Sequence, residues 1–144
     1  MFSKACEYGI KAAVFIAVKS REGKRVSLNE IAGEINSPVA FTAKVLQQLT
    51  RNKILDSIRG PSGGFEINKN KVDKIRLSRI VSAIDGDSIY SGCALGFENC
   101  NENLPCPIHH KFVLIRNELK HMLETTSLLD LSKDGNEGIT FLKR

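Results

Sequence analysis

The sequence predicts a mainly helical protein with one small β-hairpin, in which a compact first part precedes a single long helix. Apolar residues recur at steps of three and four along residues 3–20, 39–53 and 112–123, as they do in amphipathic helices. A turn rich in Gly and Pro at residues 60–64 separates two short apolar–polar alternations, which is typical of a hairpin. The 144 residues, 42% of them hydrophobic, are enough for one domain with a modest appended element.

The first helix is expected over residues 3–20, with Ser3 as its N-cap and its apolar positions facing a core. Gly23 interrupts this pattern. Ser27 then stands three residues before Glu30, which is the spacing of a capping box, and we expect a second, short helix to begin there.

The turn at residues 36–38 leads to a third helix over residues 39–53. We expect its buried face to hold Val39, Val45, Leu46 and Leu49. The opposite face is expected to hold the polar residues Thr42, Lys44, Gln47, Gln48 and Arg51. Two short helices joined by a tight turn are a helix-turn-helix candidate.

The hairpin is expected to pair residues 54–58 with residues 65–67. Arg59 stands at its base, Ser62 lies in its tip, and a run of basic residues follows it: Lys69, Lys71, Lys74 and Arg76. A helix-turn-helix with a basic hairpin beside it is a winged helix-turn-helix, which we assign to residues 1–86. The alternative is a small helical module with a loop hairpin, because such turn signals are common.

The positive charge of the chain belongs to this first part. Residues 1–90 carry fifteen Lys and Arg against nine Asp and Glu, whereas residues 91–144 carry six against seven. This asymmetry favours a polyanionic partner for the first part. We expect no signal peptide, no membrane partner and a cytoplasmic location, because charged residues interrupt the apolar start of the chain. No nucleophile–base pair, phosphate loop or pair of carboxylates indicates an enzyme or a small-molecule substrate.

Three of the four cysteines cluster after the first part, in a loop that we expect over residues 87–110. Cys93, Cys100, Cys106 and His109 follow the spacing C-x6-C-x5-C-x2-H. In a reducing compartment such a cluster favours metal or redox ligands over a disulfide framework. Iron–sulfur clusters and zinc both accept this donor set, although zinc modules usually show two close ligand pairs and only Cys106 and His109 are close here. Cys6 reads as a small buried hydrophobe.

A long amphipathic helix is expected over residues 107–130, followed by a polar tail over residues 131–144. Its apolar stripe consists of Phe112, Ile115, Leu119, Met122 and Leu123. A helix of this length beyond a compact domain suggests a partner helix, and packing against its own domain is the alternative.

Two segments, IRGPSGGFEI at residues 58–67 and LSRIVSAIDG at residues 77–86, resemble the bacterial winged-helix transcription regulators of the IscR, NsrR and RirA type. The resemblance covers nearly the whole chain, since those proteins also carry a cysteine loop and then a long helix that pairs two subunits. It implies a homodimer that binds a roughly palindromic operator in double-stranded DNA. It also implies a redox-sensing repressor, whose metal cluster in the loop changes its affinity for DNA.

The same resemblance suggests the ligands of the cluster. In regulators of the IscR type, three cysteines and one histidine hold a 2Fe-2S cluster, with a first spacing one residue shorter than here, so the matching ligands are Cys93, Cys100, Cys106 and His109. A 4Fe-4S cluster is the alternative. Relatives of the NsrR type complete their cluster with an acidic residue from the partner's first helix, and Glu7 stands at the matching place.

In a winged helix, the third helix enters the major groove of DNA. There Gln47 and Gln48 can pair with adenine edges, and Lys44 or Arg51 with guanine or phosphate. We expect Thr42, near the start of this helix, to contact a base.

The hairpin and its basic flank supply further expected DNA contacts. Arg59 can enter a narrow minor groove, Ser62 lies at the tip, and Lys71 is expected on a phosphate. Ala43 stands where regulators of the IscR type have a glutamate, so the chain lacks that basis for a cluster-dependent choice between operator classes. The competing function is an iron–sulfur or zinc redox module that uses the winged helix only for protein contacts.

Overall fold

The computed structural model describes residues 1–133. Its elements are α1 (Lys4–Arg21), α2 (Leu28–Glu34), α3 (Val39–Arg51), β1 (Asp56–Ile58), β2 (Gly64–Glu66), the 3-10 helix η1 (Lys69–Lys71), α4 (Leu77–Asp85), α5 (Ser88–Ser91), α6 (His109–Thr125) and α7 (Leu128–Lys133). The predicted fold class, mainly helical with one small hairpin, is confirmed. None of the helices within residues 1–133 combines the length and the apolar character needed to cross a membrane.

The helix α1 is the centre of the core. Ser3 caps it by accepting a hydrogen bond from the backbone N–H of Cys6 at 3.0 Å, as its sequence position predicted. Its side chains are buried almost continuously from Ala12 to Val18, so neighbouring elements must cover it on several sides. It contacts α2, α3, α4, α7, β2 and η1.

The helices α2 and α3 pack on α1 through a tight turn. Ser27 accepts a hydrogen bond from the backbone N–H of Glu30 at 3.2 Å, so the predicted cap of α2 is present. On α3, Leu46 and Leu49 are fully buried. The prediction for Val39 was wrong, because this residue is 46% exposed at the solvent-facing start of α3.

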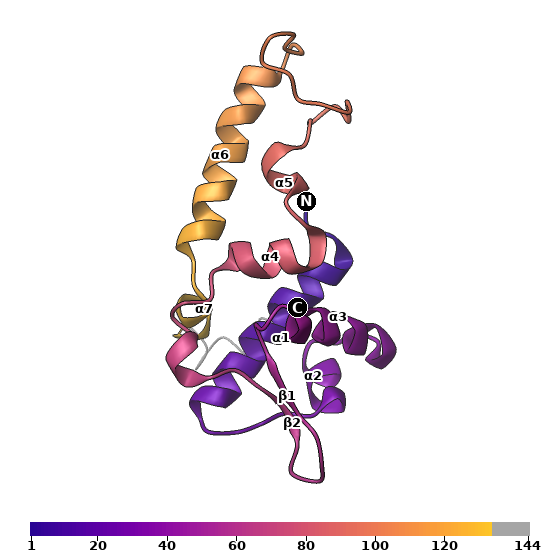
Figure 1. Ribbon diagram of the computed structural model, residues 1–144, viewed down its shortest axis with the longest axis vertical. Helices are drawn as coiled ribbons and strands as arrows, with labels where there is room; N and C mark the ends of the chain where they lie inside the picture. Colours follow the sequence, from indigo (N-terminus) through magenta and orange to yellow (C-terminus); the bar gives the residue numbers. More distant parts are fainter. Residues whose placement is uncertain (134–144) are drawn as a thin grey trace.

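The wing is an antiparallel hairpin in which Ser57 pairs with Phe65. A single bridge between Val26 and Phe65 joins β2 to the chain segment before α2. The side chain of Arg25 reinforces this join, since its Nε lies 2.9 Å from a carboxylate oxygen of Glu66 and its Nη1 donates to the carbonyl of Ser62 at 3.3 Å. The hairpin is therefore attached to the body along one side while its tip projects from it (Figure 1).

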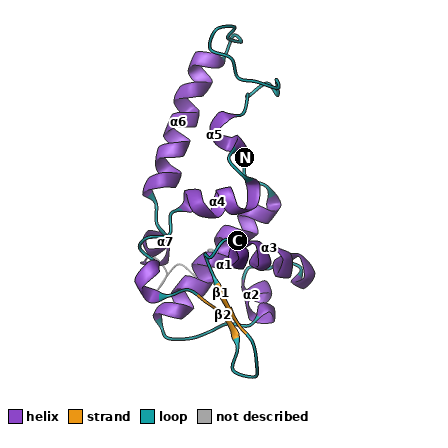
Figure 2. Cartoon of the chain, in the orientation of Figure 1, coloured by secondary structure: helices purple, strands orange, loops and turns teal. Residues whose placement is uncertain are grey.

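The second half of the chain leaves this body and returns to it. Figure 1 shows α6 extending away from the hairpin, with residues 92–108 at its far end, and Figure 2 shows that these residues form neither helix nor strand. The sequence had predicted that this helix ends at residue 130, but it ends at Thr125. Ser127 and Asp130 then form a reciprocal cap, in which each backbone N–H donates to the other's side chain.

This cap starts α7, a short helix that packs on α1 and was not predicted. Leu128 is fully buried, and its N–H donates to the carbonyl of Ile75 at 2.9 Å. The expected polar tail over residues 131–144 therefore begins inside a helix, and the rest of it, residues 134–144, lies outside the described residues.

We predict that Gly64→Ala destabilises the fold, because Gly64 has a φ of +139° and a Cβ there would lie 2.7 Å from the carbonyl oxygen of Val26. The free energy of unfolding should fall by about 1 to 3 kcal/mol in urea titrations. Gly33→Ala is the matched control, because Gly33 lies in α2 with open space around it. It should raise stability by about 0.5 to 1 kcal/mol. Equal effects of the two substitutions would contradict this account of the wing.

Candidate nucleic-acid interface and metal centre

One side of α3 is exposed and positively charged. Lys44, Gln47 and Arg51 are all exposed and stand three and four residues apart, so they share one face of the helix. Gln48 is half-buried. The structure therefore separates two residues that sequence reasoning treated alike, and Gln47 is the glutamine available to a groove.

Thr42 does not belong to this face. It is 1% exposed, its hydroxyl donates to the carbonyl of Pro38 at 2.8 Å, and it also contacts the hydroxyl of Ser37. The predicted base contact of Thr42 is wrong for this reason. The sequence did contain the signal, since Thr42 precedes Val45, Leu46 and Leu49 at the spacing of the buried stripe.

A hollow lies between α3 and the wing. It is lined by residues of both elements: Ala43, Gln47, Thr50, Arg51, Ser57, Arg59 and Phe65. This lining brings two predicted contacts, Arg51 and Arg59, together without a carboxylate between them. A concave surface with two guanidinium groups fits the phosphate backbone of a nucleic acid.

The remaining basic candidate, Lys71, lies elsewhere. It ends η1 and is exposed, and the next residue, Val72, accepts a hydrogen bond from Leu129 of α7 at 3.1 Å. Lys71 is thus on the α7 side of the body and does not line the hollow. Ser62 is exposed in the wing tip, as its position predicted.

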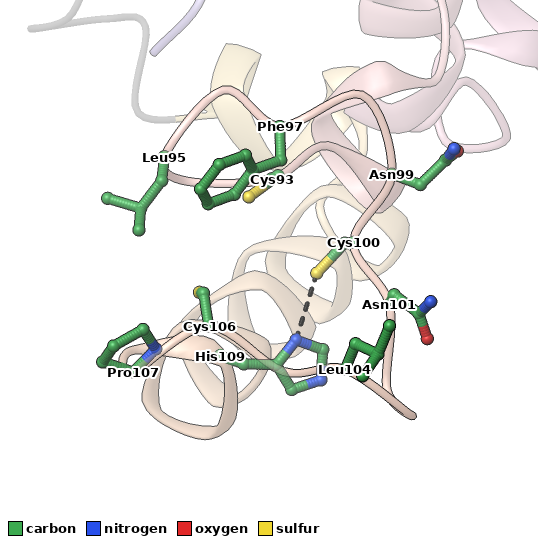
Figure 3. A pocket seen from close by; sticks show the side chains of 10 residues that line it. All are labelled: Cys93, Leu95, Phe97, Asn99, Cys100, Asn101, Leu104, Cys106, Pro107 and His109. Carbon is green, nitrogen blue, oxygen red and sulfur yellow. Dashed lines mark hydrogen bonds between the residues drawn. The ribbon is translucent and has the colours of Figure 1, made fainter.

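The cysteine loop encloses a second hollow of about 360 Å³ (Figure 3). It is lined by all four predicted ligands, Cys93, Cys100, Cys106 and His109, and by Leu95, Phe97, Asn99, Asn101, Leu104 and Pro107. Figure 3 shows that the four donors come from different stretches of the loop and from the start of α6. The chain folds them toward a common space although sixteen positions of sequence separate the first from the last.

Two of the four donors touch. The Sγ of Cys100 lies 3.3 Å from Nδ1 of His109, and His109 is only 4% exposed in the first turn of α6. Within residues 1–133, no three His, Cys, Asp or Glu side chains converge closely enough to hold one metal ion. A single zinc ion needs its donors within about 2.0 to 2.3 Å of one point, whereas a cluster distributes them over several irons. The four donors therefore share one hollow without converging on a single point.

The cysteines differ in their environment. The backbone N–H groups of Leu95 and Phe97 lower the pKa of the Cys93 thiol, which favours the thiolate that binds metal. Burial, and after it the charge of Asp85, raises the pKa of Cys6 to about 12, and Cys6 is fully buried. Cys6 is a core residue, as the sequence indicated.

Glu7, the predicted alternative ligand, lies in the first turn of α1 and forms an ion pair with Lys4 at 3.3 Å. That Glu7 binds the cluster of a partner subunit stays a prediction. Sequence reasoning missed Arg116, whose Nη1 donates to the carbonyl of Gly92 at 3.1 Å and so ties α6 to the start of the loop. No sequence pattern marks this contact, because an arginine on a charged helix reads as solvated.

The predicted apolar stripe of α6 divides between two surroundings. Leu123 is fully buried against the body of its own chain, while Ile115 is 62% and Met122 46% exposed. Ile108, the N-cap of α6, is 39% exposed, so three exposed apolar residues follow one another at steps of seven. This is the spacing of residues that pair helices.

The sequence matches a known protein family over most of its length. The model of the family Rrf2, described as an iron-dependent transcriptional regulator, matches residues 2–134. A curated relative from Aquifex aeolicus, a putative HTH-type transcriptional regulator, is 29% identical over 91% of this chain and 90% of its own. The HTH-type transcriptional regulator IscR of Pectobacterium atrosepticum is 26% identical over 86% of this chain and 74% of its own.

Solved structures with the same fold include two named regulators. CymR, described as the global cysteine regulator of B. subtilis, superposes with a TM-score of 0.78 at 24% identity, covering 92% of this chain and 96% of CymR. IscR of T. potens superposes with a TM-score of 0.73 at 19% identity, covering 95% of this chain and 89% of IscR. At these identities the likeness shows the winged-helix fold, which the sequence had predicted. It does not identify what the loop residues bind.

Proposed function

Because this chain belongs to the Rrf2 family of transcriptional regulators, we propose that it binds a specific operator as a homodimer and that an iron–sulfur cluster in the cysteine loop controls its affinity. The observation that carries the proposal is the hollow lined by Cys93, Cys100, Cys106 and His109. These donors line a hollow that is separate from the hollow between α3 and the wing, so control of DNA affinity by a cluster would have to act through the chain between them.

In this proposal residues 1–86 read DNA. Gln47 and Lys44 of α3 face base edges in the major groove, and Arg51 and Arg59 hold the backbone and the adjacent minor groove from the hollow beside the wing. Phosphate contacts supply most of the affinity and base contacts supply the preference for one sequence. The exposed guanidinium groups and the exposed glutamine support this division.

Residues 87–110 would hold the cluster. The three thiolates would bind iron as soft donors, and His109 would complete the set, with Glu7 of the partner's first helix as the alternative. A cluster with one neutral imidazole carries less negative charge than an all-thiolate cluster, which tends to raise its reduction potential and makes it a usable redox sensor. We favour 2Fe-2S because the donor set matches the IscR type.

Residues 107–130 would join the two subunits through α6. The exposed line of Ile108, Ile115 and Met122 supports this, because soluble chains rarely leave a regular apolar line uncovered. A dimer also places two copies of α3 at the spacing that a palindromic operator requires. A bacterial regulator of this kind acts on DNA in the cytoplasm.

The cluster is tested by anaerobic purification. We expect a coloured protein that contains iron and acid-labile sulfide, and we expect Cys93→Ala, Cys100→Ala and Cys106→Ala each to lose the colour, because each removes a thiolate ligand. Cys6→Ala is the matched control and should keep the colour, since Cys6 is fully buried in the core. A colourless protein with one tightly held zinc per chain after reconstitution would contradict the proposed iron–sulfur cluster.

Dimerisation is tested by sedimentation at micromolar concentration. Ile115→Asp should convert the dimer to monomer, because it places a charge in the centre of the exposed apolar line. Asn117→Asp introduces the same charge at an exposed position on another side of α6 and should leave the dimer intact. A wild-type monomer, with or without iron, contradicts this part of the proposal.

DNA reading is tested by titrating the dimer with a selected operator and a scrambled duplex at several salt concentrations. Gln47→Ala and Arg59→Ala should each weaken operator binding by about 1 to 3 kcal/mol, the usual value of a good base contact. Lys71→Ala removes a cation outside the hollow and should weaken binding to the operator and to the scrambled duplex equally. If selection from random duplexes yields no preferred sequence, the regulator hypothesis fails and the redox-module hypothesis replaces it.

A further inference from the structure

The helix α4 carries its charged residues at the ends that its own dipole disfavours. Arg79 lies in the first turn, where the helix dipole is positive, and Asp85 is the last residue, where the dipole is negative. There is no acidic residue in the first turn and no basic residue in the last turn to offset them. Both charges would be better placed at the opposite ends if α4 were considered alone.

Arg79 faces the end of the recognition helix α3. Its Nη2 donates to the carbonyls of Asn52 at 3.1 Å and Lys53 at 3.4 Å, the two residues that follow α3. Lys53 has a φ of +59°, the left-handed conformation in which helices commonly terminate. The guanidinium therefore sits at the negative end of the α3 dipole and binds carbonyls beyond the last helical turn.

Asp85 faces the beginning of α1. Its Oδ2 accepts a hydrogen bond from the backbone N–H of Ser3 at 2.9 Å, and its Oδ1 accepts one from the hydroxyl of Ser3. Ser3 is the N-cap of α1. The carboxylate therefore lies at the positive end of the α1 dipole, where an anion is stabilising.

We propose that α4 acts as a charged strut that sets the orientation of the recognition helix, with Arg79 and Asp85 as its positioning residues. Each end of α4 binds an end of a neighbouring helix, so α4 contributes to the position of α3 relative to α1 in addition to the direct packing of these two helices. Base readout needs side chains such as Gln47 to reach base edges within a narrow tolerance of distance and angle. Neither positioning residue needs to touch DNA. This inference rests on the proposed operator binding.

The opposite charges of the two residues separate positioning from simple electrostatics. Removing a carboxylate from a DNA-binding protein strengthens its general attraction to DNA, because one repulsion is lost. Asp85→Asn should nevertheless weaken operator binding if the strut positions α3, since the amide is a poorer partner for the positive end of α1. The asparagine has nearly the same size, which keeps the substitution mild.

The experiment uses the cluster-loaded dimer and measures affinity for the operator and for a scrambled duplex at several salt concentrations. Arg79→Ala and Asp85→Asn should each weaken operator binding about tenfold, part of the value of one well-placed base contact. Binding to scrambled DNA should change no more than it does in Arg76→Ala. That control removes the same charge one residue before α4, where the backbone of Arg76 forms a bridge with Ser127 ahead of α7. Arg79→Lys should recover most of the loss, because it keeps a cation at the end of α3. The absorption spectrum should stay unchanged in every variant.

Three results would overturn the inference. Equal loss on both duplexes with a shallower salt dependence in Arg79→Ala would make Arg79 a phosphate contact. Unchanged operator affinity in Arg79→Ala and Asp85→Asn, with only a lower urea midpoint, would make the two residues ordinary stabilising caps. Tighter operator binding by Asp85→Asn would show that general electrostatics outweighs positioning. A wild-type dimer without sequence preference is a different failure, because it removes the proposed function and with it the premise of this inference.

Discussion

The burial of α1 is the constraint on which the rest of the structure depends. This helix is apolar on nearly every side, so it cannot lie at a surface and must be surrounded by other elements. Small residues make the surrounding possible: at Gly9 a Cβ would collide with Ile84 of α4 and would press on Val45 of α3. The absence of a side chain at this one position lets α3 and α4 approach the same turn of α1.

The cysteine loop, unlike α1, leaves most of its apolar side chains exposed. Leu95 is 52%, Phe97 60% and Leu104 81% exposed, so the loop buries little of its own apolar surface. Its hydrogen bonds are mostly local turns, such as those closed by Gly96 on Cys93 and by His109 on Cys106, and the Arg116 side chain ties α6 to Gly92. A segment with so little burial would gain order from the cluster that we propose, because the free energy of binding a metal is then also the free energy of folding the loop. Ligand loss in such a segment can alter the start of α6 without unfolding the body.

The sequence predicted the parts of the fold that local signals determine and missed those that depend on tertiary approach. The caps at Ser3 and Ser27 and the hairpin turn are local, and each was found. Val39 and Thr42 were assigned to the wrong sides of α3, since which edge of the helix is covered depends on its angle against the body. The cap formed by Ser127 and Asp130 was readable from its spacing but was absorbed into a longer helix. The spacing of Cys93, Cys100, Cys106 and His109 drew attention to them as candidate ligands, yet their grouping in one hollow needed the folded chain. No sequence pattern indicated a role for Arg79, because an arginine in the first turn of a helix is usually a surface residue. Its contact with the end of α3 exists only in the folded chain.

A shared fold does not decide what controls this regulator. The chain superposes comparably on a protein described as a cysteine regulator and on an IscR, with TM-scores of 0.78 and 0.73. The same fold is thus compatible with different chemistries of control, which our proposal assigns to the side chains of the loop. The strut is consistent with this separation, since Arg79 and Asp85 connect helices of the body and neither lines the cysteine hollow. In this proposal the charged residues Arg79 and Asp85 hold the recognition helix within the body. Loops of different sequence at the far end of α6 would then leave the way in which α3 is held unchanged.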